Sequence, residues 1–142
     1  MPISKEETIA DDVVASEAEG DPLKVLFVDD DDQISIAAKF ILERAGHQVT
    51  LARNGHEALE LFQNEMNAYD LIITDLTMPK MTGLELGEAV RKLSKNVDMI
   101  LTSGNLDPEL QTEYEALGFN GFVRKPWTAP EMLKVLGSLN SN

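Results

Sequence analysis

Five polar side chains stand at, or directly after, the ends of short apolar runs in the sequence. They are Asp29, Asp30, Asp75, Thr102 and Lys125. Three carboxylates brought within a few ångströms of one another repel by about 4 kcal/mol per pair at an effective dielectric constant of about 20, so they need a compensating cation. Mg²⁺ binds one or two carboxylates, keeps several waters and leaves positions for phosphoryl oxygens. With an ammonium and a hydroxyl group nearby, the carboxylates therefore predict a magnesium site suited to phosphoryl chemistry.

The apolar runs themselves predict five parallel strands. They cover residues 25–28, 49–52, 71–74, 99–102 and 121–123. Continuous apolar character is typical of strands that are covered on both faces. In an open parallel sheet, ligands bind beyond the carboxyl ends of the strands, near the point where the strand order reverses. The polar side chains that follow the runs are therefore expected along one edge of the sheet.

Helical patterns separate the strands. Apolar residues at positions 34, 37, 38, 41, 42 and 45 follow helical spacing, and Gly46 offers a C-terminal stop. Later helix starts are predicted by capping pairs and by one proline at a first helical position: Asn54 with Glu57, Thr82 with Glu85, Thr128 with Glu131, and Asp107 with Pro108. Five strands alternating with five helices predict an α/β fold, a doubly wound parallel sheet with helices on both faces.

Length and composition restrict the function further. The 142 residues suit one domain, and a net charge of −13 argues against direct binding to nucleic acid or to anionic membranes. The chain has no cysteine, which excludes disulfides, thiolate zinc sites and cysteine nucleophiles. No leader pattern and no run of about 18 apolar residues is present, so we expect a cytoplasmic protein that does not enter the membrane.

Residues 1–22 differ in composition from the rest. They hold seven acidic residues and a single basic one, Lys5, and they end in a Gly-Asp-Pro run. Such a segment is predicted to be an acidic tail or linker, largely disordered. Residues 23–142 then form the domain.

At four places the sequence resembles the receiver domain of two-component response regulators. The motifs are VDD at 28–30, ITDLTMP at 73–79 followed by MTG at 81–83, ILTSG at 100–104, and FVRKP at 122–126. Each motif alone is weak, but the four in this order and spacing are specific. The resemblance covers about residues 23–140. The sequence is similar both to stand-alone regulators of the chemotaxis kind and to receivers attached to hybrid histidine kinases.

The resemblance implies a flavodoxin-like sheet with the strand order 2-1-3-4-5 and a magnesium site. Asp75 would be the phosphoacceptor. Asp30 and Asp75 would bind Mg²⁺ directly, Asp29 directly or through water, and the backbone carbonyl of Thr77 would complete the protein ligands. No other cofactor is implied.

The resemblance also implies how the domain works. Lys125, before a cis Pro126, would contact the phosphoryl group, and Thr102 and Phe122 would be the switch residues. The domain would take a phosphoryl group from a histidine kinase or a histidine phosphotransfer protein and pass the signal to an output protein or to attached kinase domains. It would assist its own phosphorylation and dephosphorylation without being a separate turnover enzyme.

A magnesium-dependent phosphatase with an aspartate nucleophile is the alternative. Such enzymes need a second acid two positions after the nucleophile, and Thr77 stands there after Asp75. Asp29 and Asp31 have that spacing, but Gln33 follows where a small hydroxyl or apolar residue is usual.

Several neighbouring residues have a simpler structural interpretation. Asp31 or Asp32 is expected to cap the first helix. His47 and His56 are expected at the surface, and neither as a phosphorylated histidine. Trp127 could contact a partner or cover the sheet edge, and the sequence leaves these two roles open.

Overall fold

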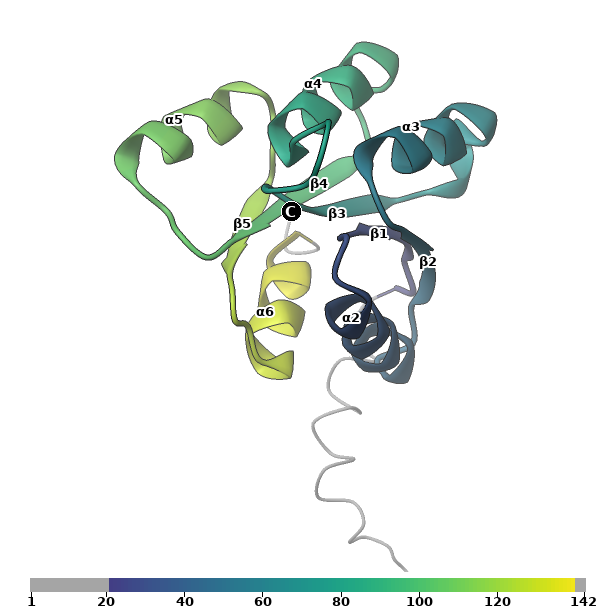
Figure 1. Cartoon of the computed structure of the whole chain (residues 1–142). Coiled ribbons are helices and arrows are strands. Elements are labelled where there is room, and N and C mark those ends of the chain that lie inside the picture. The colour runs from purple at the N-terminus through teal and green to yellow at the C-terminus, as the bar shows by residue number, and fades with distance from the viewer. Residues whose placement is uncertain (1–20, 140–142) are drawn as a thin grey trace, which may run out of the picture.

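The computed structural model describes residues 21–139, which fold around one parallel sheet (Figure 1). The strands are β1 (Lys24–Val28), β2 (Gln48–Ala52), β3 (Leu71–Asp75), β4 (Asp98–Ser103) and β5 (Gly121–Arg124). Their order is β2-β1-β3-β4-β5, and every pair is parallel. The predicted fold class and strand order are confirmed.

Helices cover both faces of this sheet. They are α2 (Asp32–Arg44), α3 (Gly55–Asn64), α4 (Gly83–Leu93), α5 (Pro108–Ala116) and α6 (Ala129–Leu139). Figure 1 shows α2 and α6 on one face and α3, α4 and α5 on the other. A short 3₁₀ helix, η1 (Met66–Ala68), precedes β3 and was not expected from the sequence.

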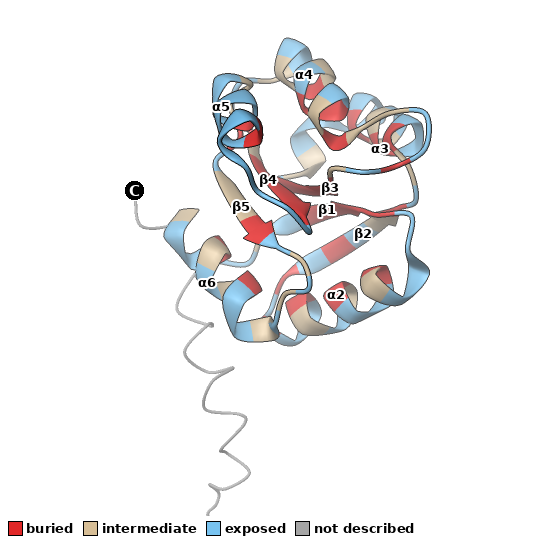
Figure 2. Cartoon of the chain, turned by 60° about the vertical axis from the view of Figure 1, so that its left-hand side comes forward, coloured by how far each residue is buried: buried red, intermediate tan, exposed pale blue. Residues whose placement is uncertain are grey.

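The alternation of side chains along the central strands creates two separate cores. In β1, Leu26 and Val28 point into the core under α3, α4 and α5, whereas Val25 and Phe27 point into the core under α2 and α6. All four side chains are at most 1% exposed. Figure 2 shows this buried layer in red between helices whose outer faces are exposed. Burial on both faces explains why the strands are continuously apolar.

Capping side chains fix where the helices begin. Asp31 accepts hydrogen bonds from the first amides of α2, Asn54 caps α3 and Asp107 caps α5. Thr82 and Glu85 form a complete capping box at α4. Each such cap contributes about 1 kcal/mol to stability. Every capping position predicted for these four helices is confirmed, and Asp31 rather than Asp32 caps α2.

Two further sequence-based expectations concern the acidic N-terminal segment and membrane insertion. The acidic tail predicted for residues 1–22 lies, except for its last two residues, outside the described residues. Within residues 21–139, no helix is long and apolar enough to cross a membrane.

His47 is buried, so the expectation of a surface position was wrong. It follows Gly46, whose φ of 102° turns the chain from α2 into β2, and its side chain is 9% exposed. Its Nδ1 accepts a hydrogen bond from the backbone N–H of Leu23, 3.0 Å away, directly before β1. Burial lowers the pKa of His47 because it disfavours the charged ring.

We expect His47→Asn to reduce the loss of stability as the pH falls from about 7.5 to 5.5. The lowered pKa means that protons bind the unfolded state first, so the contribution of His47 is present above its unfolded pKa and is lost as the pH falls. Asparagine keeps an acceptor but does not titrate. Urea unfolding at both pH values measures the difference, with the exposed His56→Asn as the control. Equal pH dependence in His47→Asn and the unmodified chain would contradict the assignment.

Candidate functional site

The ends of β1 and β3 bring the predicted carboxylates together. In the register of these neighbouring strands Val28 lies opposite Thr74, so Asp29 and Asp75 follow side by side. The register with β4 places Thr102 opposite Asp75. In the sheet, β1 has β2 on one side and β3 on the other, so the strand order reverses between β1 and β3. The site lies at this reversal.

Asp29, Asp30 and Asp75 form one acidic group. Each offers a carboxylate oxygen, and these oxygens lie within 4.8 Å of one another. Asp29 is 1% exposed and Asp75 is 6% exposed, whereas Asp30 faces solvent. The acidic group is therefore open to solvent at Asp30, and an ion could enter from that side.

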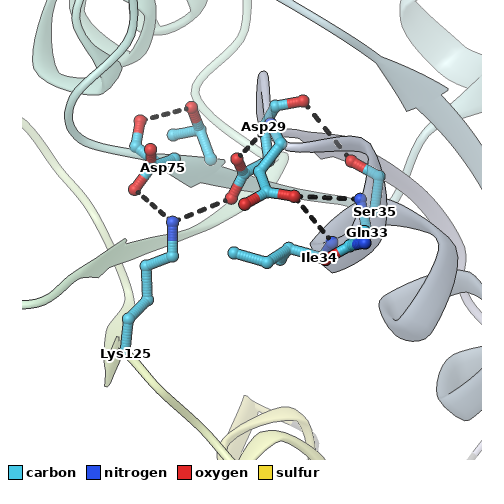
Figure 3. Close-up of polar contacts among 8 residues, drawn as sticks. Asp29, Gln33, Ile34, Ser35, Asp75 and Lys125 are labelled. Atoms are coloured by element: carbon cyan, nitrogen blue, oxygen red, sulfur yellow. Dashed lines mark hydrogen bonds and ion pairs between the residues drawn. The ribbon is translucent and has the colours of Figure 1, made fainter.

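Lys125 reaches this group from the loop after β5. Its Nζ lies 3.1 Å from Oδ2 of Asp29 and 3.2 Å from Oδ1 of Asp75 (Figure 3). Its backbone N–H donates to the carbonyl of Ser103 at 2.8 Å, which fixes the start of the loop. The peptide bond between Lys125 and Pro126 is cis, as expected.

The charges in the site shift the pKa values of its members. Burial raises the pKa of Asp75, and the charge of Asp29 raises it further, while Lys125 offsets part of this effect. Burial acts to lower the pKa of Lys125, but its hydrogen bonds and charge interactions with Asp29 and Asp75 outweigh burial and raise it. One ammonium therefore stabilises two buried carboxylates incompletely, and the site carries excess negative charge.

This donor set fits Mg²⁺. Hard divalent cations prefer oxygen ligands, and the three clustered aspartates supply carboxylate oxygens beside solvent from which waters can complete the coordination. Burial and the charge of Asp29 raise the pKa of Asp75, and a cation beside it would favour its ionised form. Thr77, two residues beyond β3, is exposed, and its carbonyl remains a predicted ligand.

Local hydrogen bonds hold Asp29 in place. Its Oδ1 accepts from the backbone N–H of Asp31 at 2.9 Å, and its carbonyl oxygen accepts from the Ser35 hydroxyl at 3.4 Å (Figure 3). The carboxylate of Asp31 is engaged in turn with the amides of Gln33 and Ile34. Ser35 was missed in the sequence, where its only signal is a small hydroxyl residue on the otherwise apolar face of α2.

Gly83 was also missed as a site residue. A Cβ atom at this first residue of α4 would collide with the backbone carbonyl oxygen of Asp75. The N–H of Gly83 donates to the carbonyl of Leu76 at 2.8 Å, and the N–H of Leu76 donates to the carbonyl of Thr102 at 2.9 Å. The backbone of the central aspartate is thus held between α4 and β4 by a contact that only glycine allows.

Thr102 and Phe122 occupy the side of the site toward β5. The Thr102 hydroxyl is buried and has no hydrogen-bond partner among the described residues. A buried hydroxyl without a partner costs about 1–3 kcal/mol. Phe122 is partly buried and its ring stacks on Tyr114 of α5, with 5.6 Å between centroids. Thr102 therefore has a hydrogen bond to gain by moving.

Trp127 covers the sheet, which favours one of its two expected roles. Its ring meets Phe27 of β1 edge-on, with centroids 6.4 Å apart. The ring is not fully buried, and with Pro126 it also lines an apolar groove of about 430 Å³ against Ile34, Ala37 and Ile41 of α2.

Comparisons with known proteins agree with this geometry. The model of the response regulator receiver domain matches residues 25–137. The sensor histidine kinase AruS of Pseudomonas aeruginosa is 32% identical over 124 residues, which cover 84% of this chain but only 12% of that protein. The structure of chemotaxis protein CheY4 of Vibrio cholerae is 36% identical, with a TM-score of 0.78 over 83% of this chain and 98% of that one.

A further solved structure is the CheX-CheY-BeF3-Mg+2 complex from Borrelia burgdorferi. Its matching chain is 26% identical, with a TM-score of 0.82, and the match covers 87% of this chain and 93% of that one. The match thus spans nearly the whole of these two small proteins but a minor part of the sensor kinase.

We expect Lys125→Met to raise the pKa of Asp75 beyond its already elevated value. Lys125 is the nearby positive charge that lowers this pKa, and methionine keeps most of the side-chain volume without the charge. Titration of the Asp75 carboxyl carbon by NMR in metal-free buffer measures the change. Lys39→Met removes a lysine whose ion pair with Glu43 is exposed, and it should leave the pKa of Asp75 unchanged. An unaltered pKa of Asp75 in Lys125→Met would contradict the electrostatic account.

Proposed function

The chain belongs to the response regulator receiver family, and on this premise we propose that Asp75 accepts a phosphoryl group from a phosphohistidine. The observation that carries the proposal is the placement of the Lys125 ammonium within 3.2 Å of Asp75 and 3.1 Å of Asp29, in a group of three carboxylates. Receiver domains are signalling modules rather than separate turnover enzymes, and we assign this role to the chain.

The transfer requires an attack by a carboxylate oxygen of Asp75 on the phosphorus of a phosphoimidazole. The new O–P bond forms as the P–N bond breaks, and the imidazole nitrogen leaves with the electron pair. Little covalent chemistry falls to the protein, so positioning and charge stabilisation dominate. The buried position of Asp75, with Lys125 beside it, provides both.

Asp29, Asp30 and Asp75, with the carbonyl of Thr77, would hold Mg²⁺. The bound cation supplies charge neutralisation for the phosphoryl oxygens. Lys125 then has two competing partners: the carboxylate of Asp29, to which it donates now, and a phosphoryl oxygen on Asp75. Asp29 also accepts a hydrogen bond from the backbone N–H of Asp31, so its position does not depend on Lys125 alone.

Phosphorylation would act on the switch residues through the unpartnered hydroxyl. A phosphoryl group on Asp75 adds charge and acceptor oxygens, and Thr102, opposite Asp75 in the sheet, can donate to one of them. Its movement would leave space for Phe122 to turn, which would change the surface formed by α5, β5 and α6. The signal is then a shift between two conformations.

The donor would be a histidine kinase or a histidine phosphotransfer protein, and an output protein or attached kinase domains would receive the signal. A donor could approach along α2 and the loop of Pro126 and Trp127, which flank Lys125 and the apolar groove. The net charge of −13 supports neither nucleic acid nor anionic membranes as partners, and we assign the domain to the cytoplasm.

The phosphatase alternative is not favoured. It would use Asp29 as nucleophile and Asp31 as acid, but the Asp31 carboxylate is committed to capping α2 through Gln33 and Ile34. After Asp75, the corresponding acid position is held by Thr77. The family match is to receiver domains.

We expect Asp75→Asn to abolish acid-labile, Mg²⁺-dependent labelling by a phosphohistidine donor or by acetyl phosphate. The amide lacks the nucleophilic oxygen, so no acyl phosphate can form at this position. Labelling with radioactive donor, with and without a chelator, measures the loss. Asp70→Asn, just before the other end of β3, is the matched control and should be labelled like the unmodified chain. Full labelling of Asp75→Asn would reject the assignment.

We also expect the phosphoryl group on Asp75 to hydrolyse without an added phosphatase, with a lifetime shorter than many hours. Gly104, two positions after Thr102, presents no side chain that could obstruct water, and Thr77 borders the same approach. A Cβ at Gly104 would find only the carbonyl of Lys125, 4.0 Å away, so Gly104→Asn should fold normally and slow the hydrolysis. Loss of label over time after removal of donor measures the rates, with Gly137→Asn on α6 as control. A phosphoryl lifetime of many hours in the unmodified chain would contradict this expectation.

A further inference from the structure

Three aromatic rings form a connected group between α4, α5 and β5. The rings of Tyr114 and Phe122 are stacked, with centroids 5.6 Å apart and planes at 20°. The ring of Phe119 meets the ring of Tyr114 edge-on, with centroids 6.4 Å apart and planes at 89°. Phe122 lies on β5, an edge strand of the sheet, and is only partly buried, so its stack on Tyr114 is a substantial contact.

Tyr114 is held in the core by a second ring, that of Phe119. It is 8% exposed and Phe119 is 6% exposed, so both belong to the core. The ring of Phe119 lies so close to Gly87 of α4 that a Cβ atom there would collide with it. Tyr114 is therefore not free to follow Phe122 if that ring moves, and any turn of Phe122 away from α5 must separate the stacked pair.

A conformational switch would give Thr102 a new contact but cost Phe122 an existing one. Phe122 is paired in the sheet with Leu101, the neighbour of Thr102 in β4. The Thr102 hydroxyl lacks a partner within the described part of the chain, and a phosphoryl group on Asp75 would supply one if Thr102 moved toward it. Phe122 already has a favourable aromatic contact and loses it by moving. The stack therefore opposes the rearrangement that Thr102 favours.

We propose that Tyr114 is a positioning residue that holds Phe122 against α5 in the unphosphorylated domain and so sets how strongly phosphorylation must act to switch it. This inference rests on the proposed function, in which Phe122 turns when Asp75 is phosphorylated. Loss of the ring of Tyr114 lowers the resistance to switching. Retention of the ring, with or without its hydroxyl, preserves that resistance.

The first measurement uses beryllium fluoride with Mg²⁺ as a mimic of the phosphoryl group. Tyr114→Leu should bind it about 2- to 10-fold more tightly than the unmodified chain, because the mimic no longer has to break the stack. Tyr114→Phe should bind like the unmodified chain. Tyr69→Leu is the matched control, since it removes the other tyrosine of the chain from a stacked pair with Phe62 at the opposite end of the sheet. Amide shifts of Asp75 report half-saturation, and titration with Mg²⁺ alone should give the same affinity in all four proteins.

The second measurement observes Phe122 directly in the unmodified chain. The stacked ring of Tyr114 should shift the aromatic proton resonances of Phe122, which are identified by their absence in Phe122→Leu. Beryllium fluoride with Mg²⁺ should remove this shift. The readout requires no variant at Tyr114 and is unaffected if Tyr114→Leu folds poorly.

The outcomes separate the two proposals. If the unmodified chain does not bind the mimic, or if Asp75→Asn binds it equally well, the proposed function fails and the inference fails with it. If the unmodified chain binds at Asp75 but Tyr114→Leu has unchanged affinity, or Tyr69→Leu changes it as much, the inference alone is overturned. Phe122 resonances that keep their shift in the presence of the mimic would also overturn it.

Discussion

The repulsion among three aspartates at the ends of β1 and β3 is the constraint on which the site depends. The fold forces these carboxylates together, because neighbouring strands in register place Asp29 beside Asp75. Burial and the charge of Asp29 raise the pKa of Asp75, and Lys125 offsets only part of this effect. A cation bound by the three carboxylates would reduce their repulsion, whereas the phosphoryl group proposed for Asp75 would add negative charge and acceptor oxygens to the same site.

Most of the fold followed from the sequence, because each element carries a local signal. The apolar runs located all five strands, and capping residues such as Thr82 and Asp107 located helix starts. The carboxylates and Lys125 were located because each lies at the end of a strand or within two residues after it. Their number and type suggested a metal, whereas the individual roles came from resemblance to a family.

Features that depend on contacts between distant segments were not predictable. His47 looked like a surface residue after a helix, but Leu23, 24 positions earlier, supplies the hydrogen bond that accompanies its burial. Gly83 looked like part of a motif, and only the packed structure shows its contact with the carbonyl of Asp75. The stacking of Phe122 on Tyr114 likewise needs the pairing of β4 with β5 and the placement of α5.

The position of Trp127 has a practical consequence. It is the only tryptophan of the chain, it lies two residues from Lys125, and its partly exposed ring rests edge-on against a phenylalanine in the core. Indole fluorescence depends on polarity and on nearby charge. Any rearrangement of the Lys125 loop therefore changes the surroundings of a single natural chromophore, so the domain carries its own optical probe and needs no attached dye.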